Sequence, residues 1–447
     1  MKKWLAVILA LSLLASFAVA SAEAAQPREV VFWHAMGGVN GQMIATLTDL
    51  YNETVGKEQG IHVTATYQGL YADMRTKFMA AVQAGELNNL PDVVQMGASA
   101  LGMMQEVKEV VWFEDILKMD TTMKIEDFEP KFVRGFSSKG RALGVPFASS
   151  TVILYYNADM LKEAGFDAPP ATLAEMGTMA AKLYKEENGE PVQWDFVCQP
   201  GSWFMSSWIG MQKSSQGDYA YIGDNADGRE GVMTKVVFDE EGTMKRFLEI
   251  YKAACDEGHF KVTSTNDLEE FAAGKVAMYI GSTSAFANVV KTVGDKFAFG
   301  CGFLPKVTAE DKGGVAAGGS SLYMLNRGDE QKMADTLRFL EYMTSAETQF
   351  KWHEGTGYFP VNIHAYALDE MKARIEKYPQ VQVMINQLQS SDPHVQEPFT
   401  GVSGTIDSSF NENILAVVTN EATIDEAIEA MADEINEALQ AYLLTLN

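Results

Sequence analysis

Three short stretches of the sequence contain residue types that could perform chemistry, and each lacks a group that the chemistry needs. The stretch from Gly135 to Arg141 has the glycine spacing of a phosphate-binding loop but not its Lys and hydroxyl, which hold phosphate and magnesium. His353-Glu354 lacks the second His of a helical zinc site. GDNADG, which ends at Gly228, lacks an acid at the first position of a calcium loop and predicts a hairpin turn instead.

The rest of the sequence offers no better catalytic pattern. It contains no G-x-S-x-G motif, and its six His residues lie far apart, with no pair at metal-ligand spacing. We therefore predict that the protein is not an enzyme and needs no cofactor or metal. The enzymatic alternative is a secreted hydrolase of a sugar phosphate or glycoside, which would need a nucleophile or a pair of carboxylates in one cleft.

The first residues indicate the compartment. Lys2 and Lys3 precede the apolar run WLAVILALSLLASFAVA, and Ala22-Glu23-Ala24 offers a cleavage site. We expect residues 1–24 to be a secretory signal peptide and the mature chain to begin near Ala25 or Gln26. An uncleaved membrane anchor is the alternative. No Cys lies near the site to carry a lipid, so we expect a soluble periplasmic protein without stable membrane insertion.

Composition excludes other classes of partner. The formal charge of -25, from 60 acidic and 35 basic residues, argues against nucleic acid, because phosphate binding requires basic patches. No later segment approaches the length of apolar sequence that spans a membrane. Cys198, Cys255 and Cys301 are too few for a disulfide framework, and either one disulfide or three buried thiols would fit.

Strand and helix signals alternate along the chain, which predicts α/β layers with largely parallel sheets. Buried strands are expected at 30–34, 62–67 and 90–96, with helices between them, and Tyr71 starts the helix over 71–85. Trp33 is expected in a core, with His34 as its hydrogen-bonded polar neighbour. The mixture of Pro, Ser and β-branched residues in 143–157 suits a chain that crosses between two lobes.

The second half continues this alternation. Helical sequence is expected over 158–187, a strand over 276–280, and a Gly-rich approach to a buried strand over 313–325. Thr344 and Thr423 each stand three residues before a Glu, which is the spacing of a helix-capping box. No flexible tether interrupts the chain, so ordered crossings must join the two lobes.

Seven motifs, in this order, carry a resemblance to a known family: FWHAMGG, TYQGLY, PFASSTVILYYN, CQPGSW, AMYIGSTS, GGSSL and WHEGTGYFPV. The chain resembles the family 1 extracellular solute-binding proteins of ABC importers, and among them the sn-glycerol-3-phosphate-binding receptors. The resemblance implies an α/β, two-lobed periplasmic binding protein fold of the maltose-binding-like, type II kind. It places the N-terminal lobe at 26–149 and 322–362, and the C-terminal lobe at 150–321 and 363–447.

The resemblance also implies ligand-binding residues at Tyr71, Ser150, Ser282, Gly319 and Tyr358, with Trp203 as an aromatic wall. The residue types fit a small polar ligand. Phenols combine an apolar ring with a hydroxyl, serines donate or accept hydrogen bonds, and adjacent glycines let backbone N–H groups approach a ligand oxygen. Each also has a purely structural alternative: aromatic rings fill cores, serines cap turns and glycines permit tight turns.

Two positions depart from the related receptors. Ala98 stands where they have a Glu, and Ser403 or a neighbour in GVSGT stands where they have an Arg. Arg is the best bidentate partner of a phosphate. Glycerol phosphate, another phosphodiester, a neutral sugar and a polyol therefore all stay open as ligands.

The expected partners follow from the same resemblance. A small-molecule ligand enters the cleft, and ABC transporter permease subunits receive the closed form, which we expect to be a monomer. A binding protein that serves a membrane sensor instead of a transporter is the alternative within this class.

Overall fold

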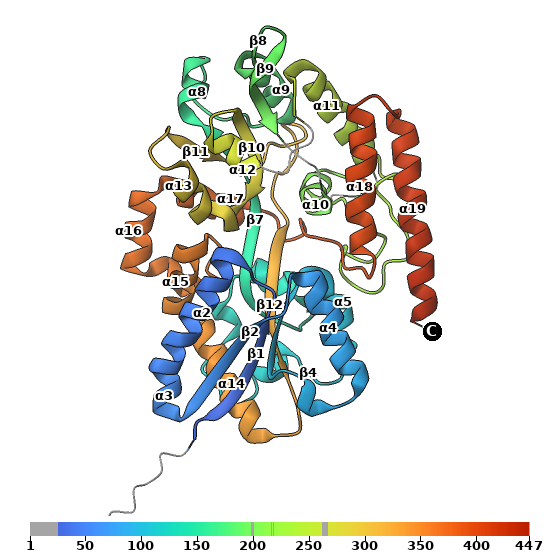
Figure 1. Cartoon of the computed structure of the whole chain (residues 1–447). Helices are drawn as coiled ribbons and strands as arrows, with labels where there is room; N and C mark the ends of the chain where they lie inside the picture. The colour runs from blue at the N-terminus through green and yellow to red at the C-terminus, as the bar shows by residue number, and fades with distance from the viewer. Residues whose placement is uncertain (1–25, 198–200, 216, 218, 262–266, 447) are drawn as a thin grey trace, which may run out of the picture.

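The computed structural model describes residues 26–197, 201–215, 217, 219–261 and 267–446 (Figure 1). The expected signal peptide and Cys198 lie outside these residues. Within them, no helix combines the length and apolar character that crossing a membrane would require.

The lower lobe in Figure 1 is built on three parallel strands, β1 (Arg28–His34), β2 (Ile61–Tyr67) and β3 (Val93–Gly97). Their connections are α2 (Gly38–Glu53) with α3 (Val55–Gln59), and α4 (Tyr71–Ala84). In β3, neighbouring side chains belong to opposite cores, as the pleat requires: Val93 joins Phe32 and α2 on one face, and Val94 joins Met74 of α4 on the other.

Two long antiparallel strands extend this sheet into the upper lobe. β12 (Ala317–Leu325) pairs with β3, and β7 (Val145–Asn157) pairs with β12. From Val152 onward β7 pairs instead with β10 (Val276–Ser282) and β11 (Phe299–Gly302). One sheet path, β2-β1-β3-β12-β7-β10-β9-β8, therefore runs through both lobes.

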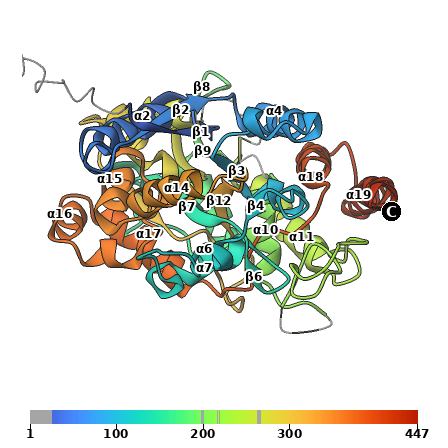
Figure 2. The ribbon, with the colours of Figure 1, turned by 90° about the horizontal axis from the view of Figure 1, so that it is seen from below.

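Helices cover both faces of the lower part of this sheet. Seen from below, α2, α14 (Glu330–Met343) and α15 (Ala346–Thr356) lie on one side of the strands and α4 lies on the other (Figure 2). At the β7 end of the sheet lie α6 (Phe113–Ile116) and α7 (Pro130–Gly135). The strand β2 forms the opposite edge.

The upper lobe has its own core. β10 pairs in parallel with β9 (Glu190–Val197), which pairs with β8 (Lys185–Glu187). The helices α9 (Leu173–Leu183) and α11 (Thr243–Gly258) pack so closely that a Cβ on Gly177 would lie 2.8 Å from the Cα of Ala254. The pair α18 (Ser403–Val418) and α19 (Ile424–Thr445) covers one side (Figure 1).

The other elements are short or peripheral. They are α5 (Leu101–Met104), α8 (Ala158–Glu163), α10 (Ser202–Gly210), α12 (Asp267–Ala272), α13 (Phe286–Val293), α16 (Asp369–Lys377) and α17 (Pro379–Ser390), with β4 (Val110–Val111), β5 (Ser137–Ser138) and β6 (Arg141–Ala142).

Most predicted strands and helices are present, and three predictions are wrong. The sheet is mixed, because both crossing strands pair antiparallel to their neighbours. The expected helical stretch 158–187 breaks into α8, α9 and the strand β8. Ser345, not Thr344, caps α15 by accepting the N–H of Thr348, while the Thr423 capping box is confirmed. Cys255 and Cys301 are buried free thiols.

Gly319 provides a test of the crossing. Its φ is +122°, and a Cβ there would lie 1.9 Å from the carbonyl oxygen of Ala148. We predict that Gly319→Ala lowers the free energy of unfolding by about 3 kcal/mol or more, because the backbone must shift and adopt a disfavoured conformation. Urea unfolding measures the difference.

Gly404→Ala is the matched control. Gly404 lies in the first turn of α18 with no atom within 4 Å of its Cβ position. Alanine should leave stability unchanged or raise it by about 0.5–1 kcal/mol. Equal stability of the Gly319→Ala variant and the parent protein would contradict this account of the crossing.

Candidate ligand-binding cleft

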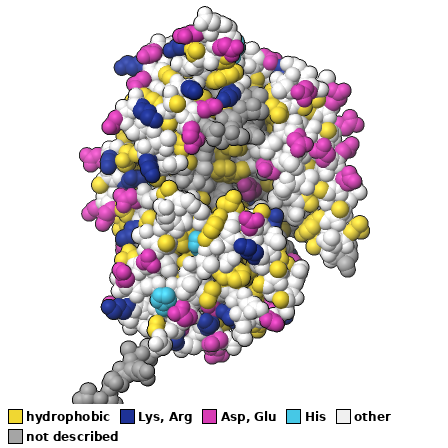
Figure 3. Space-filling view, in the orientation of Figure 1, with side chains coloured by type: hydrophobic (Ala, Val, Ile, Leu, Met, Phe, Trp, Pro, Cys, Tyr) yellow, Lys and Arg dark blue, Asp and Glu magenta, His cyan; other side chains and the backbone are white. Residues whose placement is uncertain are grey.

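Three of the predicted ligand residues lie on adjacent strands at the crossing. Ser150 on β7 stands opposite Gly318 on β12, and Gly319 stands opposite Ser149. On the other side of β7, Ser282 stands opposite Val152, about 7 Å along the strand from Ser150. The face of the molecule in Figure 3 is hollowed between the two lobes.

Tyr71 reaches the crossing from the lower lobe. It is the first residue of α4, and its ring lies 3.4 Å from the Cβ position of Gly97, the residue of β3 opposite Ser320. The hydroxyl is buried, and the Ser320 side chain is the hydrogen-bonding group beside it. Burial, reinforced by the nearby Tyr358, raises the pKa of the Tyr71 phenol.

Tyr358 approaches from the loop after α15. Its ring stacks on Trp352, with centroids 5.3 Å apart. The next residue fastens this loop to β7, because the Phe359 N–H donates to the carbonyl of Ser149 at 2.8 Å. Burial raises the pKa of the Tyr358 phenol, and the Ser284 hydroxyl opposes this shift.

Ser282 lies near these residues and also forms hydrogen bonds within the protein. Its Oγ accepts the N–H of Ser284 at 3.1 Å and lies 2.7 Å from the Ser284 hydroxyl. Its carbonyl accepts the hydroxyl of Tyr155 at 2.9 Å. Ser284, which the sequence did not single out, therefore links Ser282 to Tyr358.

Trp203 reaches the crossing from α10 in the upper lobe. Its Nε1 lies 2.8 Å from the Cβ position of Gly318, so a larger residue at 318 would collide with the indole. This nitrogen is buried and has no hydrogen-bond partner among the described residues. Trp208, by contrast, is fully buried and donates to the carbonyl of Pro305 at 3.0 Å, as expected for a core residue.

The structure therefore brings the six predicted residues together around one crossing. Packing and backbone conformation already require glycine at 318 and 319, so their identity alone does not indicate a ligand. The indole N–H of Trp203 has no hydrogen-bond partner among the described residues, and the same holds for the hydroxyls of Ser149 and Thr151 on β7, so several polar groups near the crossing are free to bond a ligand.

The sequence did not predict a buried hydrogen-bond network that lies next to these six residues. Gln95 is fully buried on β3; its Oε1 accepts the N–H of Ala35 at 3.1 Å, and its Nε2 donates to the Ser320 hydroxyl at 2.8 Å. His34 was expected to be hydrogen bonded, and the backbone of Met36 is its hydrogen-bonding neighbour.

The two positions that depart from related receptors hold no charge. Ala98 begins the short turn after β3, and Ser403 begins α18. Nearby on α18, Asp407 places Oδ1 2.9 Å from the Cβ position of Gly201, at the start of α10. The side chain that α18 places near Trp203 is therefore acidic and not basic.

Arg229 does not replace the missing Arg. Its guanidinium is buried and donates to the carbonyls of Gly135 at 2.6 Å, Ser137 at 3.2 Å and Glu397 at 3.2 Å. It thus ties α7 to the loop before α18. Burial raises the pKa of the Glu397 carboxyl to about 7, although the Arg229 charge opposes that shift.

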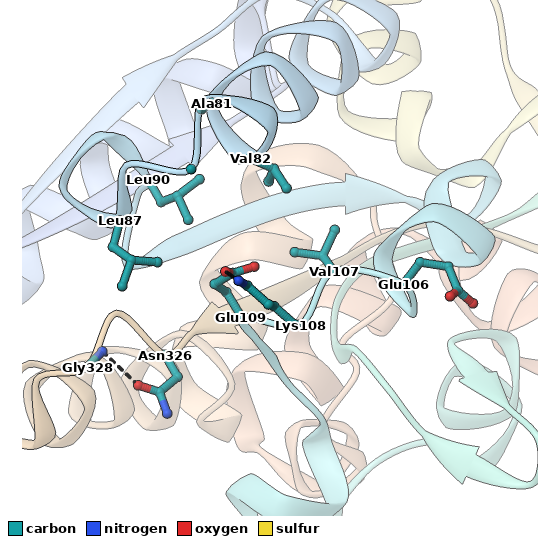
Figure 4. Close-up of a pocket in the computed structure, with 11 residues that line it drawn as sticks. Ala81, Val82, Leu87, Leu90, Glu106, Val107, Lys108, Glu109, Asn326 and Gly328 are labelled. Atoms are coloured by element: carbon teal, nitrogen blue, oxygen red, sulfur yellow. Dashed lines mark hydrogen bonds and ion pairs between the residues drawn. The ribbon is translucent and has the colours of Figure 1, made fainter.

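A separate cavity of about 660 Å³ lies elsewhere on the lower lobe (Figure 4). It is lined by Gly85, which follows the end of α4, together with Glu106, Lys108, Glu109 and Asn326. Tyr71 starts the same helix, about 20 Å away by helical rise. None of the six predicted residues lines this cavity, and the described residues contain no cluster that could hold a metal ion.

Comparison with known proteins identifies the family of the chain. Residues 49–382 match the model of the family described as bacterial extracellular solute-binding protein. The chain belongs to this family. Its sequence is 26% identical over 441 residues to the sn-glycerol-3-phosphate-binding periplasmic protein UgpB of Pectobacterium atrosepticum, covering 96% of this chain and 95% of the relative. The UgpB of Escherichia coli K12 is also 26% identical, over 429 residues, with 92% and 93% covered.

Solved structures share the fold. UgpB from Mycobacterium tuberculosis, in complex with glycerophosphocholine, superposes with a TM-score of 0.74 at 18% identity, covering 93% of this chain and 99% of that one. The sugar-binding protein MalE from Xanthomonas citri gives 0.73 at 21% identity, with 94% and 99% covered. The predicted two-lobed, maltose-binding-like α/β fold is confirmed.

Two Tyr→Phe substitutions test whether the Tyr71 hydroxyl is free for a ligand. Removing it should change the free energy of unfolding of the unliganded protein by less than about 1 kcal/mol, because its polar neighbour, Ser320, is already bonded to Gln95. Tyr155→Phe should lower it by about 1 kcal/mol, because that hydroxyl donates to Ser282. Urea unfolding compares the two, and a Tyr71→Phe protein destabilised as much as the Tyr155→Phe protein would assign the Tyr71 hydroxyl to the protein's own bonding.

Proposed function

We propose that this protein is the periplasmic substrate-binding component of an ABC importer, which captures a small polar solute between its lobes and delivers it to membrane permease subunits. The observation that carries the proposal is the convergence of Tyr71, Tyr358 and Trp203 with two serines at the β7–β12 crossing, in a chain of the solute-binding family. The protein acts as a receptor and performs no reaction on its ligand.

Capture proceeds by closure of the lobes. Tyr71 belongs to a helix of the lower lobe and Trp203 to a helix of the upper lobe, so a solute between them gains contacts from both. A ligand that binds the closed form better than the open form shifts the population toward closure. The crossing strands β7 and β12 are the hinge of this motion.

The lining favours a solute rich in hydroxyl groups. Phenol, serine hydroxyl and indole N–H groups donate or accept single hydrogen bonds, while aromatic rings cover the apolar faces of sugars and polyols. UgpB proteins are named for sn-glycerol 3-phosphate, and glycerophosphocholine occupies one of them. With Ala98 and Ser403 uncharged, sugars and polyols belong in the ligand class of this chain beside glycerol phosphate and its diesters.

A thermal-shift screen over glycerol phosphates, phosphodiesters, sugars and polyols identifies the ligand. A solute present at 100 times its Kd adds about 2.7 kcal/mol of stability to the folded state, so it raises the melting temperature. Tyr71→Ala or Tyr358→Ala should abolish the shift. Tyr358→Phe is the milder companion, since it keeps the ring that stacks on Trp352.

Tyr184→Ala is the control for this screen. Tyr184 stacks on His259 in the upper lobe and lies outside the cluster, so its loss should leave the shift intact. A full shift in both the Tyr71 and the Tyr358 alanine variants would disprove the site assignment. Turnover of the bound solute would disprove the receptor function.

Secretion is tested by the mass of the mature chain. Expressed in a bacterium with a periplasm, the protein should lose residues 1–24 and begin at Ala25 or Gln26, because Ala22-Glu23-Ala24 offers the cleavage site. Intact-mass measurement of the periplasmic fraction reads the new N-terminus. Recovery of the full-length chain from the membrane fraction would contradict this prediction.

A further inference from the structure

Tyr67 is an exposed aromatic residue whose position the packing of the lobe does not explain. It is the last residue of β2, and it is 48% exposed, next to a loop whose Leu70 is 64% exposed. Large apolar side chains grouped on a soluble surface commonly mark a binding surface. Hydrophobic side chains also lie along the lower rim of the hollow in Figure 3.

The Tyr67 ring is held on one side and open on the other. Its centroid lies 5.8 Å from that of His34, which in turn lies 5.7 Å from Phe32. The hydroxyl lies 3.4 Å from the Cβ position of Gly37, so the backbone at the start of α2 lies beside the hydroxyl end of the ring. His34 is 5% exposed, and burial lowers its pKa to about 4, so the imidazole behind the ring is neutral at pH 7. The result is a fixed, flat platform backed by an uncharged ring.

The topology places this platform at the outer end of the cleft. β1, β2 and β3 are parallel, so Tyr67, His34 and Gly97 lie at the same edge of the sheet. In the order β2-β1-β3-β12, Tyr67 is three strand spacings from Gly319, about 14 Å. Tyr71, whose ring lies on Gly97, stands between the two. A solute that touches both Gly319 and Tyr67 must be longer than glycerol phosphate or one sugar ring.

We propose that Tyr67 forms an outer subsite that stacks the second ring of an oligosaccharide whose first ring binds at the Ser150–Gly319 crossing. This proposal rests on the proposed function and narrows its ligand class. A single open ring face suits the flat C–H face of a sugar. A quaternary ammonium group is recognised instead by several aromatic rings around it. The uncharged residues at 98 and 403 agree with a neutral ligand.

The test compares ligands of different length on matched variants. Titration calorimetry measures glucose against maltose, mannose against mannobiose, and glycerol 3-phosphate against glycerophosphocholine. Tyr67→Ala should weaken binding of the disaccharide about three- to tenfold, the range expected for an aromatic stacking contact, and leave the monosaccharide unchanged. Tyr67→Phe keeps the ring and should bind both as the parent does.

The remaining outcomes separate this subsite from the proposed function. The subsite is disproved if Tyr67→Ala weakens binding of the monosaccharide and the disaccharide equally, or weakens binding of neither. It is also disproved if the protein binds glycerophosphocholine but none of the four sugars. In each of these cases the receptor function stands, and Tyr71→Ala still abolishes binding. Failure of every solute to bind counts against the receptor function itself, and the subsite falls with it. Because Tyr67 is half exposed, its variants should melt within about 2 °C of the parent.

Discussion

The pairing of β7 with β12 is the interaction on which the rest of the structure depends. It is the place where a single sheet passes from one lobe to the other, and its register sets Ser150 against Gly318 and Ser149 against Gly319. Gly319 must be glycine because the carbonyl of Ala148 occupies the space of a side chain. The register in turn decides which groups of each lobe meet: Gly97 and Tyr71 through β3, and Ser282 through β10.

Buried polar groups hold this crossing in one register. Gln95 joins the end of β1 to β12 through Ala35 and Ser320, while Tyr155 and Thr283 join β7 to the turn after β10. Because a buried group without its partner costs about 1–3 kcal/mol, a shift by one residue would break several of these bonds at once. The Trp203 N–H and the hydroxyls of Ser149 and Thr151 lie at the same crossing and have no hydrogen-bond partner among the described residues.

The sequence predicts the local parts of this site well, because local parts have local causes. The helix that begins at Tyr71 follows from periodic apolar residues, and the strand character of 145–157 follows from its β-branched and aromatic residues. Strand direction does not follow from such patterns: whether β12 runs parallel or antiparallel to β3 depends on residues 225 positions apart, such as Gln95 and Ser320. Ser345 replaced Thr344 as a cap for a similar reason, since the Thr344 hydroxyl bonds back to Leu340 in the preceding helix.

Arg229 illustrates why charge cannot be assigned to a binding site from sequence alone. An Arg is the residue expected to hold a phosphate, and this one lies close to the loop where related receptors carry theirs. Its N–H groups nevertheless bond the carbonyls of Gly135, Ser137 and Glu397, and burial lowers its pKa to about 10, with the Glu397 charge opposing that shift. Drawing this guanidinium toward a ligand would deprive these carbonyls, and that of Arg134, of their donor and would loosen α7 from the loop before α18. In the proposed function, the cluster at the crossing therefore recognises its solute with hydroxyl, indole and backbone groups, and such groups discriminate by shape and hydrogen bonding rather than by charge.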